Sequence, residues 1–312
     1  MTSGFAEDVT RGLASRPKSV PPRHFYDELG SRLFDAICRL PWYTITRAEL
    51  GLLPLAAARV LDTGGARTLV ELGPGSGEKL AVLLAHAPAP LDGMTIHLVD
   101  ISAAALDESE RKLGAFPGLA LVAHRATFED GLAAAARGRR RGERRLVLFL
   151  GSNVGNLDAE ASQRFLCTVR RSLEPGDGLL LGADLVKDEA DLLLAYDDPL
   201  GVTAAFDKNL LVRINRELGA DFDLDAFEHH AVWNAAESRV EMHLVARRAC
   251  RVTVPGAGVA ADFAAGESLF TESSYKYEID SLSGRVASCG FAAEEAWRDD
   301  AARYALLLFS AA

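Results

Sequence analysis

The chain has 312 residues, of which 49% are hydrophobic and 25% are charged, values typical of a folded globular protein rather than a disordered one. Lys and Arg number 34 against 44 Asp and Glu, so the formal net charge is −10. A chain this acidic is a poor general binder of nucleic acid or anionic membranes, and no apolar run approaches the roughly 18 residues of a membrane span.

Two further features of the sequence bear on its location. Residues 1–23 contain no apolar core of a signal peptide, and the cysteines form no C-x-x-C pair. We therefore expect a cytoplasmic protein without nucleic-acid or membrane partners. We also expect no cysteine-bound metal and no disulfide framework. The four cysteines are Cys38, Cys167, Cys250 and Cys289.

The length is about twice that of a typical domain, which predicts either two lobes or one large domain with an insertion. The first 22 residues are polar and end in two prolines, which predicts an arm that crosses the surface. Apolar residues then recur every three or four positions from Phe25 to Leu40, which predicts a helix that ends at Pro41. A second helix is expected at Arg47–Leu61.

From Thr68 onward, short β-type runs alternate with helical ones. This alternation predicts a doubly wound α/β sheet, with the wholly apolar run Leu146–Leu150 as a central parallel strand. The expected strands are Thr68–Leu72, Thr95–Asp100, Leu119–Ala123, Leu146–Leu150 and Gly178–Leu185, and the expected helices are Lys79–Ala87, Ser102–Leu113 and Ala159–Leu173.

The pattern changes again near residue 190. A helical stretch interrupted at Pro199 runs to about Gly219, and after Asp225 the apolar period becomes two, as in antiparallel strands. The C-terminal stretch predicts a helix at Ala292–Trp297 and a strand at Tyr304–Phe309. The region after residue 190 is therefore expected to be an insertion before the sheet resumes.

Two features invite other functions. The basic run Arg137–Arg145 suggests either a nucleic-acid patch or a solvated loop, and the net acidity of the chain favours the loop. The pair His229-His230 invites a metal site, but no further ligand stands at a suitable spacing, so no metal is expected.

The most specific local pattern is a glycine loop between the first strand and its helix. Glu71-Leu72-Gly73-Pro74-Gly75-Ser76-Gly77 allows positive φ and close approach of a ligand, and Asp100 ends the next strand where a carboxylate can accept hydrogen bonds from ribose hydroxyls. A dinucleotide fold would need glycine where Glu78 stands, and the P-loop pattern is absent. The loop and the acid resemble the first two motifs of class I S-adenosylmethionine-dependent methyltransferases; a glycine turn without a ligand is the alternative.

Longer motifs narrow the resemblance. In chain order, about residues 24–311 resemble the L-histidine Nα-methyltransferases of ergothioneine biosynthesis. The motifs that carry the resemblance are Phe25-Tyr26-Asp27-Glu28-Leu29-Gly30-Ser31, Thr46-Arg47-Ala48-Glu49, Phe149-Leu150-Gly151-Ser152, Asp184-Leu185-Val186-Lys187-Asp188, Ala195-Tyr196-Asp197-Asp198, Ile214-Asn215-Arg216-Glu217-Leu218 and Thr271-Glu272-Ser273-Ser274.

The resemblance implies three successive methyl transfers from S-adenosylmethionine to the α-nitrogen of L-histidine, which give hercynine. The group that leaves in such a displacement is neutral, so no metal is expected. It implies a Rossmann-like methyltransferase domain of residues 56–190 and 276–312, and an α+β substrate-binding domain of residues 1–55 and 191–275. Two alternatives stay open: a methyltransferase of the same scaffold for another amino acid or small amine, and a catalytically silent S-adenosylmethionine-binding module.

The resemblance also assigns residues. Gly73, Lys79, Asp100, Thr127 and Phe128 would contact the methyl donor. Tyr43 would face the reacting amine, Asn156 and Tyr196 would hold the substrate carboxylate, Glu272 and Ser274 would hold the imidazole, and Met242 would line its pocket. Without the family resemblance, several of these residues would be explained by structure alone. Met242 would be expected to pack in the core, and Glu272 would be expected to lie on a solvated surface.

Two positions depart from the family pattern. Thr127 stands where the family usually has an acid before the phenylalanine, and Tyr43 is followed by Thr44-Ile45 where the family tends to have a second tyrosine and a proline.

Overall fold

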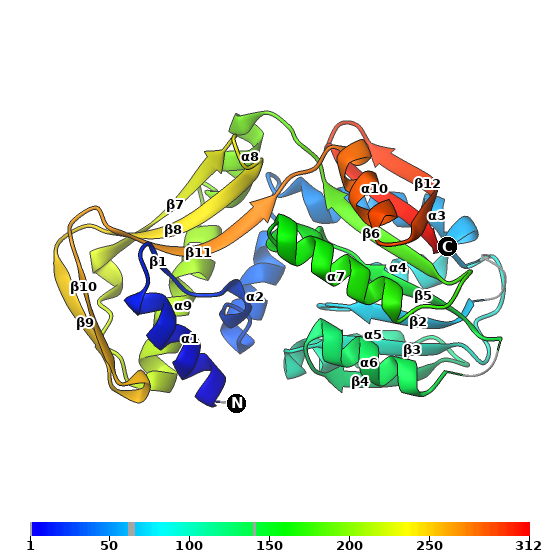
Figure 1. Ribbon diagram of the computed structural model, residues 1–312, viewed down its shortest axis with the longest axis horizontal. Helices are drawn as coiled ribbons and strands as arrows, with labels where there is room; N and C mark the ends of the chain where they lie inside the picture. The colour runs from blue at the N-terminus through cyan, green and yellow to red at the C-terminus, as the bar shows by residue number, and fades with distance from the viewer. Residues whose placement is uncertain (1, 62–65, 140–141) are drawn as a thin grey trace. The chain divides into compact units, whose positions relative to one another are not determined.

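The structure is a computed structural model that describes residues 2–61, 66–139 and 142–312 (Figure 1). The chain separates into two compact units: unit 1 is Met1–Tyr43 with Lys187–Ser274, and unit 2 is Thr44–Val186 with Tyr275–Ala312. None of the described helices is long and apolar enough to cross a membrane. α3 (Thr44–Leu61) belongs to unit 2, where its Glu49 is bonded to Tyr304 and Gly151.

Among the described residues, unit 2 contains a seven-stranded sheet that confirms the predicted doubly wound α/β class. The strand order is β12-β13-β6-β5-β2-β3-β4, and the five strands from β6 to β4 pair in parallel. The last two strands of the chain add at one edge in the antiparallel sense. The strands are β2 (Ala66–Leu72), β3 (Thr95–Asp100), β4 (Ala120–Arg125), β5 (Arg144–Phe149), β6 (Gly178–Asp184), β12 (Phe291–Asp299) and β13 (Tyr304–Ala311).

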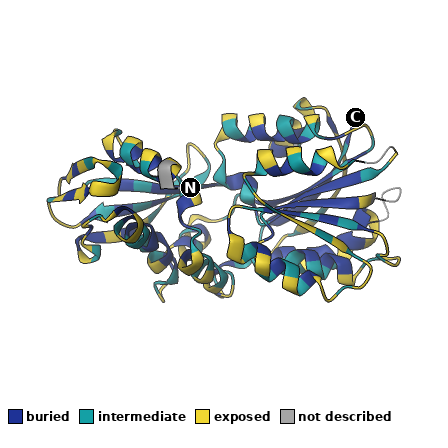
Figure 2. Cartoon of the chain, turned by 90° about the horizontal axis from the view of Figure 1, so that it is seen from below, coloured by how far each residue is buried: buried dark blue, intermediate teal, exposed yellow. Residues whose placement is uncertain are grey.

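Helices cover both faces of this sheet (Figure 2). One face packs on α6 (Phe128–Arg137), α7 (Ala159–Arg171) and α10 (Ile279–Ser288) through a continuous apolar core. On the other side α3 packs against α4 (Glu78–Ala85), and α4 packs against α5 (Ala103–Leu113). The short 3-10 helix η2 (Asn153–Asn156) follows the carboxyl end of β5, the edge where ligands of such sheets bind.

Unit 1 contains a four-stranded sheet of the order β1-β11-β8-β7, whose longer strands run side by side (Figure 1). Buried and half-buried side chains alternate along β8, as its period of two predicts. Its strands are β1 (Lys18–Ser19), β7 (Phe227–Asn234), β8 (Arg239–Ala246) and β11 (Ser268–Tyr275), with a separate hairpin of β9 (Cys250–Val254) and β10 (Val259–Phe263). Its helices are α1 (Thr2–Ala14), α2 (Glu28–Ile37), α8 (Glu189–Tyr196) and α9 (Val202–Leu218), with the 3-10 turns η1 (Pro22–His24), η3 (Leu224–Ala226) and η4 (Pro255–Ala257).

Two sequence-based element predictions are wrong. The expected N-terminal arm is largely the helix α1, which buries Phe5, Val9 and Leu13 at intervals of four residues. The expected helix Ala292–Trp297 lies within β12, which pairs antiparallel with β13. Its side chains are mostly exposed at the edge of the sheet, so the sequence lacks the alternation that would have identified a strand.

The basic run is partly structural. Arg139 forms ion pairs with Glu174 and Asp177, and Arg145 is buried within β5. Arg140 and Arg141 lie outside the described residues. The described part of the run therefore holds the approach to β5 in place.

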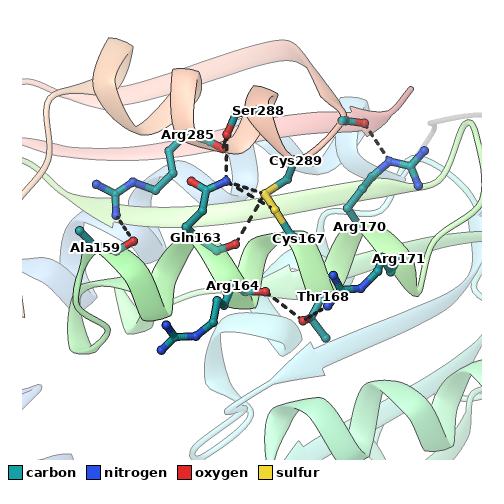
Figure 3. Close-up of a disulfide and its surroundings, with 11 residues drawn as sticks. Ala159, Gln163, Arg164, Cys167, Thr168, Arg170, Arg171, Arg285, Ser288 and Cys289 are labelled. Atoms are coloured by element: carbon teal, nitrogen blue, oxygen red, sulfur yellow. Dashed lines mark hydrogen bonds between the residues drawn. A yellow bond between two sulfur atoms is a disulfide. The ribbon is translucent and has the colours of Figure 1, made fainter.

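A disulfide corrects the expectation drawn from the cysteine spacing. Cys167 of α7 is bonded to Cys289, the residue that follows α10 (Figure 3). The side-chain amide of Gln163 lies 3.0 Å from the Cys289 sulfur and 2.9 Å from the Ser288 hydroxyl. The two cysteines are 122 residues apart and meet only because α7 and α10 cover the same face of the sheet.

Candidate active site

The glycine loop of unit 2 adopts the conformation that its residues permit. Gly73, Gly75 and Gly77 have φ values of 75°, 55° and 71°, the left-handed region that favours glycine. Gly75 is exposed, and a Cβ placed on it would meet nothing within 4 Å. The Gly75 backbone is therefore open to a ligand at the carboxyl end of β2.

Asp100 lies beside this loop at the end of β3. Its Oδ1 accepts a hydrogen bond of 2.8 Å from the Ser102 amide, and the amides of Gly75 and Ile101 also donate to its carboxylate. Burial raises the pKa of Asp100 above its ordinary value despite these donors. The structure thus brings the loop and the acid together, as their positions at neighbouring strand ends predicted.

Lys79 belongs to a buried network that the sequence did not reveal. Its Nζ lies 2.7 Å from Oε2 of Glu49, whose side chain is fully buried. Glu49 also accepts hydrogen bonds from the Gly151 amide at 2.9 Å and from the Tyr304 hydroxyl at 2.5 Å. Glu49 therefore ties the first turn of α4 to the turn after β5.

A signal for Glu49 was present but is weak. The glutamate lies on the buried stripe of α3, among Ile45, Ala48, Leu52 and Leu53. A carboxylate on an apolar stripe indicates a buried partner, but the sequence does not say which. Both partners outside α4 lie far away in the sequence, so only the fold identifies them.

Glu71, the acid before the glycine loop, is held in its neutral form. Its side chain is buried, and its Oε2 has no hydrogen-bond partner among the described residues. Burial raises the pKa of Glu71 to about 8, with Lys79 opposing and Glu49 and Asp100 adding to the rise. At pH 7 this carboxyl is therefore mostly protonated.

Thr127 and Phe128 begin α6. Thr127 caps the helix, since its hydroxyl accepts a hydrogen bond from the Asp130 amide at 3.2 Å. The Phe128 ring packs edge-on against Phe149, and its edge lies 3.6 Å from where a Cβ on Gly73 would stand. The structure thus brings Phe128 to the glycine loop, while it gives Thr127 the role of a helix cap.

A second group of predicted residues gathers in unit 1. The Tyr43 ring lies edge-on to Tyr196 and to Phe34, with centroids 6.2 and 6.3 Å away. The hydroxyls of Tyr196 and Ser274 share a hydrogen bond of 2.7 Å. Tyr43, Tyr196 and Ser274 are all buried, so two phenols and a hydroxyl are largely removed from water in unit 1.

The two remaining unit 1 positions are buried as well. Glu272 is only 7% exposed, which excludes the solvated-surface interpretation. Met242 is buried on β8, and its carbonyl accepts a hydrogen bond of 2.9 Å from the Thr271 hydroxyl. Glu272 of β11 is thus a buried carboxylate at the position that the family resemblance assigns to the imidazole.

Asn156 belongs to unit 2, at the end of η2, where it is half-buried. The preceding turn is anchored, because the Tyr277 hydroxyl donates to the Val154 carbonyl at 2.9 Å. Gly155 is required there, since a Cβ would come within 2.8 Å of the Tyr275 carbonyl oxygen. The substrate role of Asn156 stays a prediction.

The chain is similar in sequence to known methyltransferases. Residues 5–311 match the family described as histidine-specific methyltransferase, SAM-dependent. The chain is 46% identical to histidine N-alpha-methyltransferase of Mycolicibacterium smegmatis over 303 residues, 96% of this chain and 93% of the relative. It is 43% identical to the protein of the same name of Mycobacterium tuberculosis over 302 residues, 96% of this chain and 93% of that relative.

A fungal relative shares part of its length with the chain. Ergothioneine biosynthesis protein 1 of Schizosaccharomyces pombe is 30% identical over 225 residues, which cover 69% of this chain and 29% of that protein.

Proposed function

The chain belongs to the family of S-adenosylmethionine-dependent, histidine-specific methyltransferases, and we propose that it methylates the α-amino nitrogen of L-histidine three times to give hercynine for ergothioneine biosynthesis. One observation supports the proposal most strongly. Unit 1 buries two phenols, a hydroxyl and a carboxylate at the positions that the family resemblance assigns to the substrate: Tyr43, Tyr196, Ser274 and Glu272.

The residues of unit 2 fit the methyl donor. The open backbone at Gly75 suits close approach of the donor, and the Asp100 carboxylate beside it is suited to accept hydrogen bonds from ribose hydroxyls. Phe128 would offer a ring face or edge to the adenine, and Gly73 and Lys79 would complete the contacts. When bound, S-adenosylmethionine supplies an electrophilic methyl group.

The protein must present an unprotonated amine in line with that methyl group. In a peptide context an α-amine titrates near 7.7–8.0, so part of such an amine is neutral at mildly alkaline pH and a strong general base is not required. Tyr43 would orient one N–H of the amine, and its ring would stabilise the growing ammonium charge. Alignment of this kind can lower a barrier by up to roughly 7–11 kcal/mol.

Histidine would be selected by its ring. Glu272 and Ser274 lie two residues apart on β11, and both are buried. Glu272 would accept an N–H from one imidazole nitrogen and Ser274 would contact the other, with Met242 lining the pocket. A phenyl or indole ring cannot bond to both groups, so it forgoes hydrogen bonds that contribute about 1.5–3 kcal/mol where one partner is charged.

The substrate carboxylate would be held by Asn156 and Tyr196. Tyr196 already shares a hydrogen bond with Ser274, so the anchor for the carboxylate and the anchor for the imidazole are joined before substrate binds. Such joined anchors would hold the amino acid in place while the amine turns between rounds of methylation.

The proposal includes a cytoplasmic location, because histidine and the methyl donor are intracellular metabolites, and it includes no nucleic-acid or membrane partner. It also includes no metal, because the thioether that departs is uncharged and needs no Lewis acid. We expect turnover in excess EDTA to equal turnover in buffer. Loss of activity in EDTA that a divalent ion restores would contradict this part of the proposal.

Product analysis tests the reaction. The protein is incubated with methyl-labelled S-adenosylmethionine and histidine, and products are read by mass, with the methyl position read by NMR. The proposal requires a gain of three methyl groups on the α-nitrogen. Methylation of the imidazole, or activity only on another amino acid in a parallel panel, would refute it.

A further inference from the structure

A buried chain of hydrogen bonds in unit 1 ends on the backbone of Tyr196. Nδ1 of His229 lies 2.7 Å from Oδ2 of Asp207, and Nε2 of the same ring lies 2.9 Å from the Tyr196 carbonyl oxygen. The side chains of His229 and Asp207 are 1% and 0% exposed. His229 comes from β7 and Asp207 from α9, so two elements converge on the end of α8.

The partners of His229 fix its protonation. A carboxylate oxygen and a carbonyl oxygen are both acceptors, so each ring nitrogen must carry a hydrogen to make its bond. A neutral imidazole has only one N–H. Both ring nitrogens of His229 therefore carry a hydrogen, and the ring is an imidazolium paired with the Asp207 carboxylate. This pair holds one proton more than a neutral imidazole beside a carboxylate would.

The surroundings of His229 favour this charge. Burial lowers the pKa of the ring, but the hydrogen bond and charge of Asp207, the Tyr196 carbonyl and the charge of Asp197 raise the pKa above its ordinary value overall. Asp207 faces the ring from α9, and Asp197 stands directly after α8. Across the sheet, the residue of β8 opposite His229 is Leu244, which is uncharged.

The bond to Tyr196 closes the end of a helix. Tyr196 is the last residue of α8, where carbonyls lack partners within the helix and a positive charge is favoured. The hydroxyl of the same tyrosine is bonded to Ser274. Tyr196 is thus held at its backbone by His229 and at its side chain by β11.

We propose that Asp207 and His229 form a charged clamp that positions Tyr196 to bind the substrate carboxylate. The inference rests on the substrate role given to Tyr196 in the proposed function; His229 and Asp207 are positioning residues that do not touch the substrate. When the pair loses its extra proton, the remaining N–H stays with Asp207, and the bare Nε2 faces the Tyr196 carbonyl. The clamp then opens and substrate affinity falls.

Three variants test the clamp. His229→Ala removes the donor to Tyr196. Asp207→Asn keeps the donor to the Tyr196 carbonyl. The introduced side-chain amide can donate to Nδ1, so a neutral ring carries its one hydrogen on Nε2. His230→Ala is the matched control, since His230 is the next residue on the same strand and its side chain is half exposed.

The readouts are KM for histidine and kcat between pH 6 and pH 10, with the Kd of S-adenosylhomocysteine as a measure of intact unit 2. For wild type and His230→Ala we expect KM to be about tenfold higher at pH values above the pKa of the His229–Asp207 pair than at pH values below it. For Asp207→Asn we expect no such rise beyond the titration of the substrate itself. For His229→Ala we expect KM to be about tenfold higher at every pH, with the Kd changed less than twofold.

If His229→Ala has the same KM and the same pH dependence as wild type, the clamp is overturned. So would a pH dependence in Asp207→Asn identical to that of wild type.

A measurement without turnover separates this inference from the proposed function. In protein labelled with ¹⁵N in histidine, the His229 signal is assigned by its loss in His229→Ala. Both ring nitrogens should be protonated at pH 7. A single protonated nitrogen would refute the clamp even if histidine is methylated, and two protonated nitrogens would support the charged pair even if another amino acid is the substrate.

Discussion

Asp100 is the residue on which the methyl-donor site of unit 2 depends most directly. Its carboxylate is already held by backbone amides at the glycine loop, so its removal should weaken the binding of S-adenosylhomocysteine without loss of the fold. A hydrogen bond to a charged group contributes about 1.5–3 kcal/mol, so Asp100→Ala should raise the Kd by roughly ten- to 150-fold. Calorimetric titration measures this, with Asp107→Ala on the exposed face of α5 as control. A Kd within twofold of wild type would show that Asp100 does not bind the ribose.

The raised pKa of Glu71 predicts that the free energy of unfolding depends on pH. Its folded pKa is about 8 against an ordinary value of 4.5, so the folded state binds its proton more tightly than the unfolded state does. Stability from this group is therefore complete below about pH 4.5 and is lost as the pH rises to about 8. Between pH 6 and pH 9 this group alone lowers the free energy of unfolding by about 3 kcal/mol.

Glu71→Gln removes that titration. Urea unfolding at pH 6 and pH 9 should show a smaller loss of stability in the variant than in wild type. Parallel losses in the two proteins would mean that Glu71 ionises normally in the folded state.

The sequence could predict some residue positions and not others. Glu272 and Ser274 stand two apart on a strand, so a common face followed from the period of two. The bond between Tyr196 and Ser274 joins residues 78 apart, and that between His229 and Asp207 joins residues 22 apart on different elements. Such contacts depend on how helices pack on sheets, and no local spacing encodes them.

At the scale of elements, a helix or strand could be predicted correctly from the sequence where it has an extensive buried apolar face. β5 is buried along nearly its whole length and was predicted from its apolar run. β12 is an exposed edge strand rich in Ala and Glu, which favour helices, and the partner that makes it a strand is β13. α1 presents only three buried apolar side chains in a polar stretch, too few to distinguish it from a surface arm.

The bond between Cys167 and Cys289 joins α7 to the end of α10, and it gives a prediction about these elements. In a reducing cytoplasm the pair is expected to be two thiols, and it should close on oxidation. Oxidised protein should then resist unfolding by about 2–5 kcal/mol more than reduced protein, because the bond closes a loop of 122 residues.

Thermal unfolding with and without dithiothreitol measures the difference. Cys167→Ser should abolish it, and Cys38→Ser should retain it. Alkylation of unfolded, oxidised wild-type protein should label two of the four cysteines. Labelling of all four would contradict the pairing.

For the whole molecule, the alternation of strands and helices predicted the class of the sheet, and the series of motifs predicted the family. The period of the apolar pattern changes near residue 190, and the structure divides the chain into two units with one boundary at 186/187. No pattern in the sequence indicates the boundary at residue 43. The residues of α3 predict a helix whichever unit it belongs to, and the bonds of the buried Glu49 attach this helix to unit 2.

Substrate choice is the central claim, and competition between histidine and tryptophan tests it most directly. Equal concentrations of the two amino acids are offered to wild type, to Glu272→Ala and to Glu237→Ala, a control in the exposed turn between β7 and β8, and products are counted by mass. Wild type and the control should methylate histidine almost alone. Glu272→Ala should lose roughly tenfold to a hundredfold in kcat/KM for histidine, and its ratio of methylated tryptophan to methylated histidine should rise. If Glu272→Ala keeps the wild-type preference for histidine, Glu272 does not bind the imidazole, and if wild type itself prefers tryptophan, histidine is not the substrate.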